Sequence, residues 1–184
     1  MEGDDDYRIW SEVPRHHIVK ISVVPCNGEE IHEYQKTLEK IFLSILDSPS
    51  SPRGYVLIDG DKTTPSVEQK QIKYVRLNCR ESENLYLTDE ILSSLGLNWD
   101  TACEKVIQQS GNYGEKSEEL KKIKSWNRKS VDCKKYINEI ANILDEKKLS
   151  WAYRLGKELG KQKPTGQLSD YLGNEVISSL WKSA

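Results

Sequence analysis

The hydrophobic positions in the first half of the chain alternate between strand-like and helix-like patterns. A short continuous apolar run at 55–58 is typical of a strand that is buried on both faces, and it ends abruptly in Asp59-Gly60-Asp61. β-Branched residues at 18–24 and the segment 73–78 predict two further strands. This order of strand, helix and strand favours a parallel sheet with right-handed crossovers. The packed crossover helix between 24 and 55, which Asn27 is expected to cap, has these apolar residues at helical spacing: Ile31, Tyr34, Leu38, Ile41, Phe42 and Ile45.

Helical patterns flank these strands on both sides. The N-terminal helix is expected to have three aspartates in its first turn, at 4–6, and to end at Pro14. Another helix is expected to begin near Thr88, and beyond Gly96 the pattern is wholly helical. The chain is thus expected to divide into an α/β domain at 1–96 and a helical extension at 97–184. The residues expected to be buried are Ile9, Trp10 and Val13 in the first helix, Cys133, Tyr136, Ile137, Ile140 and Leu144 after Lys129, Trp151, Leu155 and Leu159 in the next helix, and the apolar positions of a last helix at 168–181.

Composition narrows the class of protein. The chain has 184 residues, of which 36% are hydrophobic and 30% are charged, as in a soluble domain with a real core. No apolar run approaches the roughly 20 residues of a membrane span, and the N-terminus is acidic where a signal peptide would be basic. The cysteines form no CxxC pair, so reduced thiols in a cytoplasmic protein are expected rather than a zinc site. They are Cys26, Cys79, Cys103 and Cys133.

The net charge of −2 conceals two oppositely charged halves. Residues 1–110 contain 19 acids and 12 bases, whereas residues 111–184 contain 10 acids and 15 bases. The basic half could hold phosphates along a nucleic-acid backbone without reading its sequence. The alternative is an ordinary solvated surface, which the charge counts alone favour. The lysines expected to contact the nucleic-acid backbone are Lys134, Lys135, Lys147 and Lys148.

Acidic residues recur at or beyond the ends of the predicted strands. If those strands are parallel neighbours, the acids meet at the edge of the sheet where open α/β sheets bind ligands. Crowded carboxylates repel one another unless they share a proton or a cation, and their oxygens suit Mg²⁺. The acidic pairs are Glu2 with Asp6, Asp59 with Asp61, and Glu81 with Glu83. The ordinary alternatives are a turn at 59–61, a helix-dipole role for Asp6, an ion pair of Glu83 with Arg80, and a disordered Glu2.

Three segments also resemble a known family. Residues 2–6, EGDDD, resemble the EGxxD opening of Toprim domains, and residues 57–62, LIDGDK, resemble their DxD strand. Residues 80–92, RESENLYLTDEIL, resemble the R-E-x-E-N-Y-L segment of ATP-dependent endonucleases of the OLD (overcoming lysogenization defect) family and related phage-defence proteins. The three segments have the family's order and spacing over the first half of the chain. The resemblance implies a Toprim-like, Rossmann-like parallel sheet with flanking helices.

The resemblance also implies an activity, namely Mg²⁺-dependent cleavage of phosphodiester bonds in DNA or RNA. Mn²⁺ is the alternative cofactor, with one or two ions bound. A lysine of the C-terminal helical part assists the chemistry in this family, which implies Lys157, with Lys161 as its nearest rival. The implied partners are nucleic acid and an ATPase domain or separate ATPase chain; a homo-oligomer is left open, and no membrane is expected. The implied metal ligands are Glu2, Asp6, Asp59, Asp61 and Glu83.

The chain departs from the family pattern in two ways. Met1 directly precedes Glu2, where the family has its first strand, and no GxxxxGK[ST] phosphate loop is present. These departures predict a C-terminal piece of a larger protein, produced by truncation, gene splitting or design. A second hypothesis is a non-catalytic Toprim-like module that binds a partner ATPase or nucleic acid. A third is a primase-like or topoisomerase-like use of the same acids, although no tyrosine nucleophile context supports it.

Overall fold

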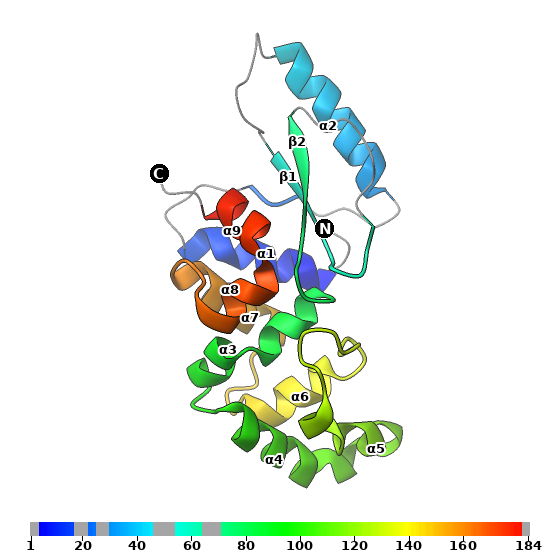
Figure 1. The fold of residues 1–184 in the computed structure, drawn as a ribbon, viewed down its shortest axis with the longest axis vertical. Helices are drawn as coiled ribbons and strands as arrows, with labels where there is room; N and C mark the ends of the chain where they lie inside the picture. The colour runs from blue at the N-terminus through cyan, green and yellow to red at the C-terminus, as the bar shows by residue number, and fades with distance from the viewer. Residues whose placement is uncertain (1–3, 17–21, 25–29, 46–53, 64–70, 182–184) are drawn as a thin grey trace.

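The computed structural model describes residues 4–16, 22–24, 30–45, 54–63 and 71–181. This part of the chain is mixed α/β and mostly helical, with a small parallel sheet of two strands. In Figure 1 the sheet and α2 lie at one end of the molecule, α3 to α6 lie at the other, and α1 and α7 to α9 lie between them. The elements are α1 Asp4–His16, α2 Ile31–Ile45, β1 Gly54–Ile58, β2 Ile72–Arg76, η1 Ser82–Leu87, α3 Asp89–Ser94, α4 Trp99–Gln109, η2 Ser110–Lys116, α5 Ser117–Leu120, η3 Ile123–Ser125, α6 Ile137–Leu144, α7 Trp151–Lys161, α8 Gly166–Leu172 and α9 Asn174–Leu180.

The two strands confirm the predicted parallel pairing. β1 and β2 run side by side with Val56 opposite Tyr74 and Ile58 opposite Arg76. The prediction that β1 is buried on both faces is wrong, because all five of its residues are only half-buried. Within the described residues β1 pairs with β2 alone, so it does not have the two strand neighbours that bury an interior strand. The predicted strand at 18–24 is not regular at 22–24, and the rest of it lies outside the described residues.

Helix α1 forms as predicted, with Asp4 to Asp6 in its first turn and with Ile9, Trp10 and Val13 buried. It continues to His16, so the predicted end at Pro14 is wrong. A proline inside a helix removes one backbone hydrogen bond, and here the buried face before it keeps the last turn in place. α1 packs along α7. Gly156 makes this possible, because a Cβ at that position would collide with the carbonyl oxygen of Ile9.

Helix α2 also forms, although the predicted cap Asn27 lies outside the described residues. Its packing differs from the expected crossover helix, because Tyr34 and Ile41 are exposed while Gln35 is buried. The carboxylate of Glu39 explains this orientation, since it accepts hydrogen bonds from the first backbone N–H groups of β2. α2 therefore turns a polar face toward the sheet.

In the described residues beyond Gly96 all the regular elements are helices, as predicted, and they are joined by irregular stretches at 126–136 and 145–150. α3 begins after Thr88 and α7 buries Trp151, Leu155 and Leu159, both as expected. The predicted last helix at 168–181 is instead two helices, α8 and α9. They are separated by Gly173, whose φ of 86° belongs to the region that favours glycine.

The hydrophobic core draws on both sides of the expected boundary at 96. One buried cluster contains Ile9 and Trp10 of α1, Val75 of β2, Leu155 of α7 and Trp181 near the C-terminus. α1 thus depends for its packing on a helix about 140 residues away. No helix in the described ranges has the length and apolar character needed to cross a membrane.

Candidate functional site

The carboxyl ends of β1 and β2 lie together and carry acidic segments. The backbone pairing of the strands continues past them, through the N–H of Leu77 to the carbonyl of Ile58 at 3.0 Å and the N–H of Asp61 to the carbonyl of Arg80 at 3.2 Å. Gly60 allows this approach, because a Cβ there would collide with the carbonyl oxygen of Cys79. The segments 59–61 and 80–83 therefore share one edge of the sheet.

Asp59 and Asp61 lie in a turn rather than in the strand. The N–H of Lys62 donates to the carbonyl of Asp59 at 3.2 Å, which closes the turn. The expected strand alternation therefore does not govern the directions of these side chains. Asp61 forms an ion pair with Arg80, with 3.7 Å between Oδ2 and Nε. The negative charge of the Asp59 carboxylate raises the pKa of Lys134.

Asn84 fixes the segment that follows β2. Its side chain is fully buried, its Oδ1 accepts the N–H of Glu81 at 3.0 Å, and its amide nitrogen donates to the carbonyls of Arg128 at 2.8 Å and Val131 at 2.9 Å. Two of these hydrogen bonds thus tie the first turn of η1 to the loop before α6, and the third caps the start of η1. The chain needs an amide here, because a carboxylate could not donate to the two carbonyls.

Glu81 has a structural role in this arrangement. One carboxylate oxygen, Oε1, accepts the backbone N–H groups of Cys133 at 3.0 Å and Lys134 at 2.9 Å. This contact brings residue 134 next to the acids, although it lies 53 positions further along the chain. Residues 133 and 134 are held at the sheet edge by a carboxylate that the sequence suggested only as part of an acidic pair.

Glu83 is a buried carboxyl group of this edge. It is 7% exposed, and its pKa is raised to about 7, mainly by burial, with Glu81 and Asp6 contributing to the rise and a backbone hydrogen bond and Lys134 opposing it. Asp6 belongs to the first turn of α1, so a third element contributes an acid to the same place. The predicted ion pair of Glu83 with Arg80 is not formed; Arg80 lies near Asp61 and Asp132.

Lys134 is the basic residue of this cluster. Partial burial lowers its pKa, but the nearby carboxylates outweigh that effect and raise the pKa above its ordinary value. Those carboxylates are Glu83, Asp59, Asp6 and Glu81. We use the name acidic edge for these four acids together with Lys134.

The other predicted site residues lie elsewhere. Lys135 is exposed and pairs with Asp132 at 3.6 Å, and the rival lysine Lys161 pairs with Glu158 at 2.6 Å. Lys147 and Lys148 lie in the turn between α6 and α7. Lys157 lies half-buried on α7 and is not among the groups that perturb Glu83. Glu2 lies outside the described residues.

The donor chemistry of the acidic edge suits a hard divalent cation, because it offers only carboxylate oxygens from several elements. Burial is the main cause of the raised pKa of Glu83, and the charges of Glu81 and Asp6 add to it; a bound cation would oppose both effects. In the described part of the chain, however, no three His, Cys, Asp or Glu side chains are grouped as ready ligands for a metal ion. The donor types fit Mg²⁺, and the observed arrangement is not a closed ligand set.

Sequence reasoning missed the position of Lys134 and the anchoring by Asn84. Lys134 was expected to contact a nucleic-acid backbone, and no local sequence pattern distinguishes it from Lys135 beside it. Cys133 is buried as expected, and Cys79 is buried as well; burial raises the pKa of the Cys79 thiol to about 12, with Asp59 adding to the effect. These thiols are therefore unreactive as nucleophiles.

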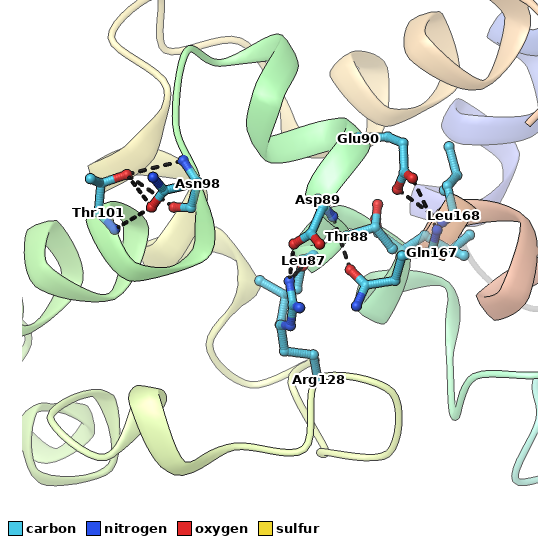
Figure 2. A network of polar contacts seen from close by, with 10 residues as sticks. Leu87, Thr88, Asp89, Glu90, Asn98, Thr101, Arg128, Gln167 and Leu168 are labelled. Atoms are coloured by element: carbon cyan, nitrogen blue, oxygen red, sulfur yellow. Dashed lines mark hydrogen bonds and ion pairs between the residues drawn. The ribbon is translucent and has the colours of Figure 1, made fainter. Parts of the chain in front are cut away.

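A polar network connects η1, α3 and α8 (Figure 2). Arg128 donates through Nη1 to the carbonyl of Leu87 at 3.0 Å and to the Asp89 carboxylate at 2.6 Å. Glu90 of α3 accepts two N–H groups in the first turn of α8, those of Gln167 and Leu168, each at 2.9 Å. The contacts of Glu90 thus join α3 to α8, and those of Arg128 join the end of η1 and the start of α3 to the loop that contains Asn84's partners. Further along, Asn98 and Thr101 cap the start of α4 (Figure 2).

Comparison with known proteins adds no relative to these observations. No protein-family model, curated protein or solved structure matches the chain significantly. The class of protein is therefore given by the fold alone: a mixed α/β chain in which acids gather at the carboxyl edge of a parallel sheet.

Proposed function

We propose that this chain is a Toprim-like, metal-dependent nuclease that hydrolyses phosphodiester bonds of DNA or RNA. The observation that supports the proposal is the convergence on one lysine of acids from α1, from the turn after β1 and from η1. Asp6, Asp59 and Glu83 all act on Lys134. Burial, with Glu81 and Asp6 adding to it, raises the pKa of Glu83 to about 7. The segments that resemble the OLD family contain these same acids, and the family resemblance adds an ATPase domain or chain as the proposed partner.

Asp59, Glu83 and Asp6 are the residues that would hold Mg²⁺ or Mn²⁺, with Asp61 and Glu2 as the remaining candidates. When bound, such an ion supplies an activated water and a charge clamp on the phosphate oxygens. Asp61 would first have to leave its ion pair with Arg80, which is long at 3.7 Å and partly exposed. Glu81 would stay in place, because it holds the backbone N–H groups of residues 133 and 134.

The chain's own contribution to the chemistry would come from Lys134. The acids act on its ammonium and raise its pKa above the ordinary value, so Lys134 would stabilise the negative charge that develops on a phosphate. Lys157, which the resemblance implied, competes with Lys134 for this role. The two assignments predict different variants to be inactive, because only Lys134 interacts with the acidic edge in the described structure.

The second candidate function is a non-catalytic module that binds a partner ATPase or nucleic acid. Two observations favour it: Glu81 is occupied by backbone groups, and the described residues contain no ready ligand set for a metal ion. Such a module would bind its partner and leave nucleic acid uncut with every metal.

Cleavage of supercoiled plasmid and of single-stranded RNA, each with Mg²⁺, Mn²⁺ or a chelator, tests the proposal. We expect metal-dependent cleavage that Asp59→Asn and Glu83→Gln each reduce by roughly 100-fold, since even outer contacts of metal sites cost 10- to 100-fold. Lys134→Met should reduce cleavage and Lys157→Met should not. The control is Asp100→Asn, an exposed acid of α4 that pairs with Lys124 at 3.7 Å. A folded chain that cuts neither substrate with either metal would favour the non-catalytic module.

A further inference from the structure

Arg80 is held firmly by its backbone beside the acidic edge. Its N–H donates to the carbonyl of Lys129 at 2.9 Å, and its carbonyl accepts the N–H of Asp61 at 3.2 Å. The next residue is Glu81, whose carboxylate binds the backbone N–H groups of residues 133 and 134. The backbone of Arg80 is therefore fixed between the turn after β1 and the loop before α6.

The guanidinium group of Arg80 is held far less firmly. Asp61 Oδ2 lies 3.7 Å from Nε and Asp132 Oδ2 lies 3.7 Å from Nη2, and both distances are longer than a hydrogen bond. Nε is buried and has no hydrogen-bond partner in the described part of the chain. The side chain as a whole is nevertheless 38% exposed. A positively charged group with unused donors therefore lies at the surface of this edge.

Two other arginines of the chain show what a structural arginine looks like here. Arg154 donates three hydrogen bonds to the carboxylate of Asp145, at 2.8–3.0 Å. Arg128 donates to the carbonyl of Leu87 at 3.0 Å and to the carboxylate of Asp89 at 2.6 Å. Both guanidinium groups are saturated by close protein acceptors, and that of Arg80 is not.

We propose that Arg80 binds a phosphate group of a nucleic-acid backbone at the acidic edge. The planar guanidinium fork matches two oxygens of one phosphate, and its fixed backbone places the fork in advance. Such a contact positions the nucleic acid without reading its sequence. This inference rests on the proposed nuclease function for its ligand, and it adds the residue that would hold the substrate beside the candidate metal ligands.

Asp61 connects phosphate binding to metal binding. Its carboxylate is a candidate metal ligand and is also one of the two acids near the Arg80 guanidinium. A cation that takes Asp61 would leave Arg80 with Asp132 alone, and the less neutralised guanidinium would attract phosphate more strongly. Asp61→Asn imitates this step without a metal ion, so it should strengthen the binding of nucleic acid through Arg80.

Fluorescence anisotropy of a labelled single-stranded DNA, about 20 nucleotides long, tests the phosphate contact separately from cleavage. Binding is measured in a chelator and again with Ca²⁺, which also takes oxygen ligands. Arg80→Gln should raise the dissociation constant about tenfold and reduce its dependence on salt by the equivalent of about one phosphate contact. Arg80→Lys should keep the salt dependence, because its charge remains. It should still weaken binding about threefold, because an ammonium cannot bind two oxygens in parallel.

Two further variants separate a specific contact from a general effect of charge. Asp61→Asn should lower the dissociation constant about threefold more in the chain with Arg80 than in the Arg80→Gln variant. The matched control is Lys124→Gln, because Lys124 also lies 3.7 Å from an acid, Asp100 of α4, at the end of the molecule away from the sheet (Figure 1). This control should change the dissociation constant by less than about twofold, since salt screens distant charges.

Thermal melting should place all variants within about 3 °C of the unmodified chain, and Arg80→Lys decides if Arg80→Gln melts much lower. The proposal is overturned if the unmodified chain does not bind the DNA in either condition, or if Arg80→Gln binds it as tightly as the unmodified chain. Binding that depends on Arg80, without cleavage by any metal, would support the phosphate contact and refute the nuclease. Active cleavage with unchanged binding in Arg80→Gln would refute the phosphate contact alone.

Discussion

The raised pKa of Glu83 makes the stability of the fold depend on pH in a defined direction. Burial, with Glu81 and Asp6 adding to it, moves the pKa from the ordinary 4.5 to about 7. The folded state therefore holds the Glu83 proton more tightly than the unfolded state. The resulting stabilisation is fully present below about pH 4.5 and is lost as the pH rises through about 7.

The size of this effect follows from the shift. A rise from 4.5 to about 7, at 1.36 kcal/mol per pKa unit, corresponds to roughly 3 kcal/mol. Glu83→Gln should remove this contribution, because the amide has the same shape and does not ionise. Between about pH 5 and pH 8 the unmodified chain loses this contribution and the variant does not. The difference in free energy of unfolding between the two chains should therefore shift by roughly 2–3 kcal/mol in favour of the variant.

Urea unfolding of both chains in the presence of a chelator, at about pH 5 and at about pH 8, measures this difference in free energy of unfolding. The control is Glu115→Gln, which changes an exposed glutamate of η2 and should leave the pH dependence as it is in the unmodified chain. If Glu83→Gln and the unmodified chain lost the same free energy of unfolding between the two pH values, the assignment of the shift to Glu83 would be refuted.

Three further substitutions test the contacts that hold the acidic edge and its supports. Asn84→Ala leaves one N–H and two carbonyls without their partner and should cost about 3–5 kcal/mol by urea unfolding. Gly156→Ala should cost about 1–3 kcal/mol, because its Cβ meets the carbonyl of Ile9 and must force α1 away from α7. Arg154→Met leaves the Asp145 carboxylate, which is 2% exposed, without its ion pair and should cost about 3–5 kcal/mol.

Each of these three substitutions has a control substitution at a residue that makes no such contact. Asn138→Ala changes an exposed amide on α6, and Gly111→Ala adds a Cβ that meets nothing within 4 Å. Lys121→Met breaks the surface ion pair with Glu118, which is 2.6 Å long but exposed on both sides. All three should stay within about 1 kcal/mol of the unmodified chain. A test variant that is no more destabilised than its counterpart contradicts the contact assigned to it.

The elements that could be predicted from sequence are those that local patterns specify. The strand at 54–58 is a short apolar run between a glycine and an Asp-Gly turn, and α3 follows a threonine with two acids in its first turn. α1 and α7 each have one apolar face at helical spacing. Where the pattern is interrupted the predictions fail: Gly173 ends α8 within the single helix expected at 168–181.

The arrangement of these elements could not be predicted in the same way. An apolar stripe shows that a face can be buried, but not what covers it, which is why α2 was expected to pack on the sheet through residues that are exposed. Lys134 illustrates the same limit for the site. Its position depends on Glu81, which binds the backbone N–H groups of residues 133 and 134, a contact across more than 50 residues of sequence.

The charge balance of the acidic edge is the physical reason to prefer the nuclease over the non-catalytic module. Four carboxylates act on a single lysine, and one of them, Glu83, is driven toward its protonated form. A module that only binds a partner gains nothing from this crowding, because a glutamine or leucine at Glu83 would cost less to bury. A divalent cation would offset the repulsion among the acids and bind only the folded state, so it would raise the melting temperature. The excess of negative charge at this edge is therefore a cost to the fold that a bound cation would offset, which supports the proposed nuclease.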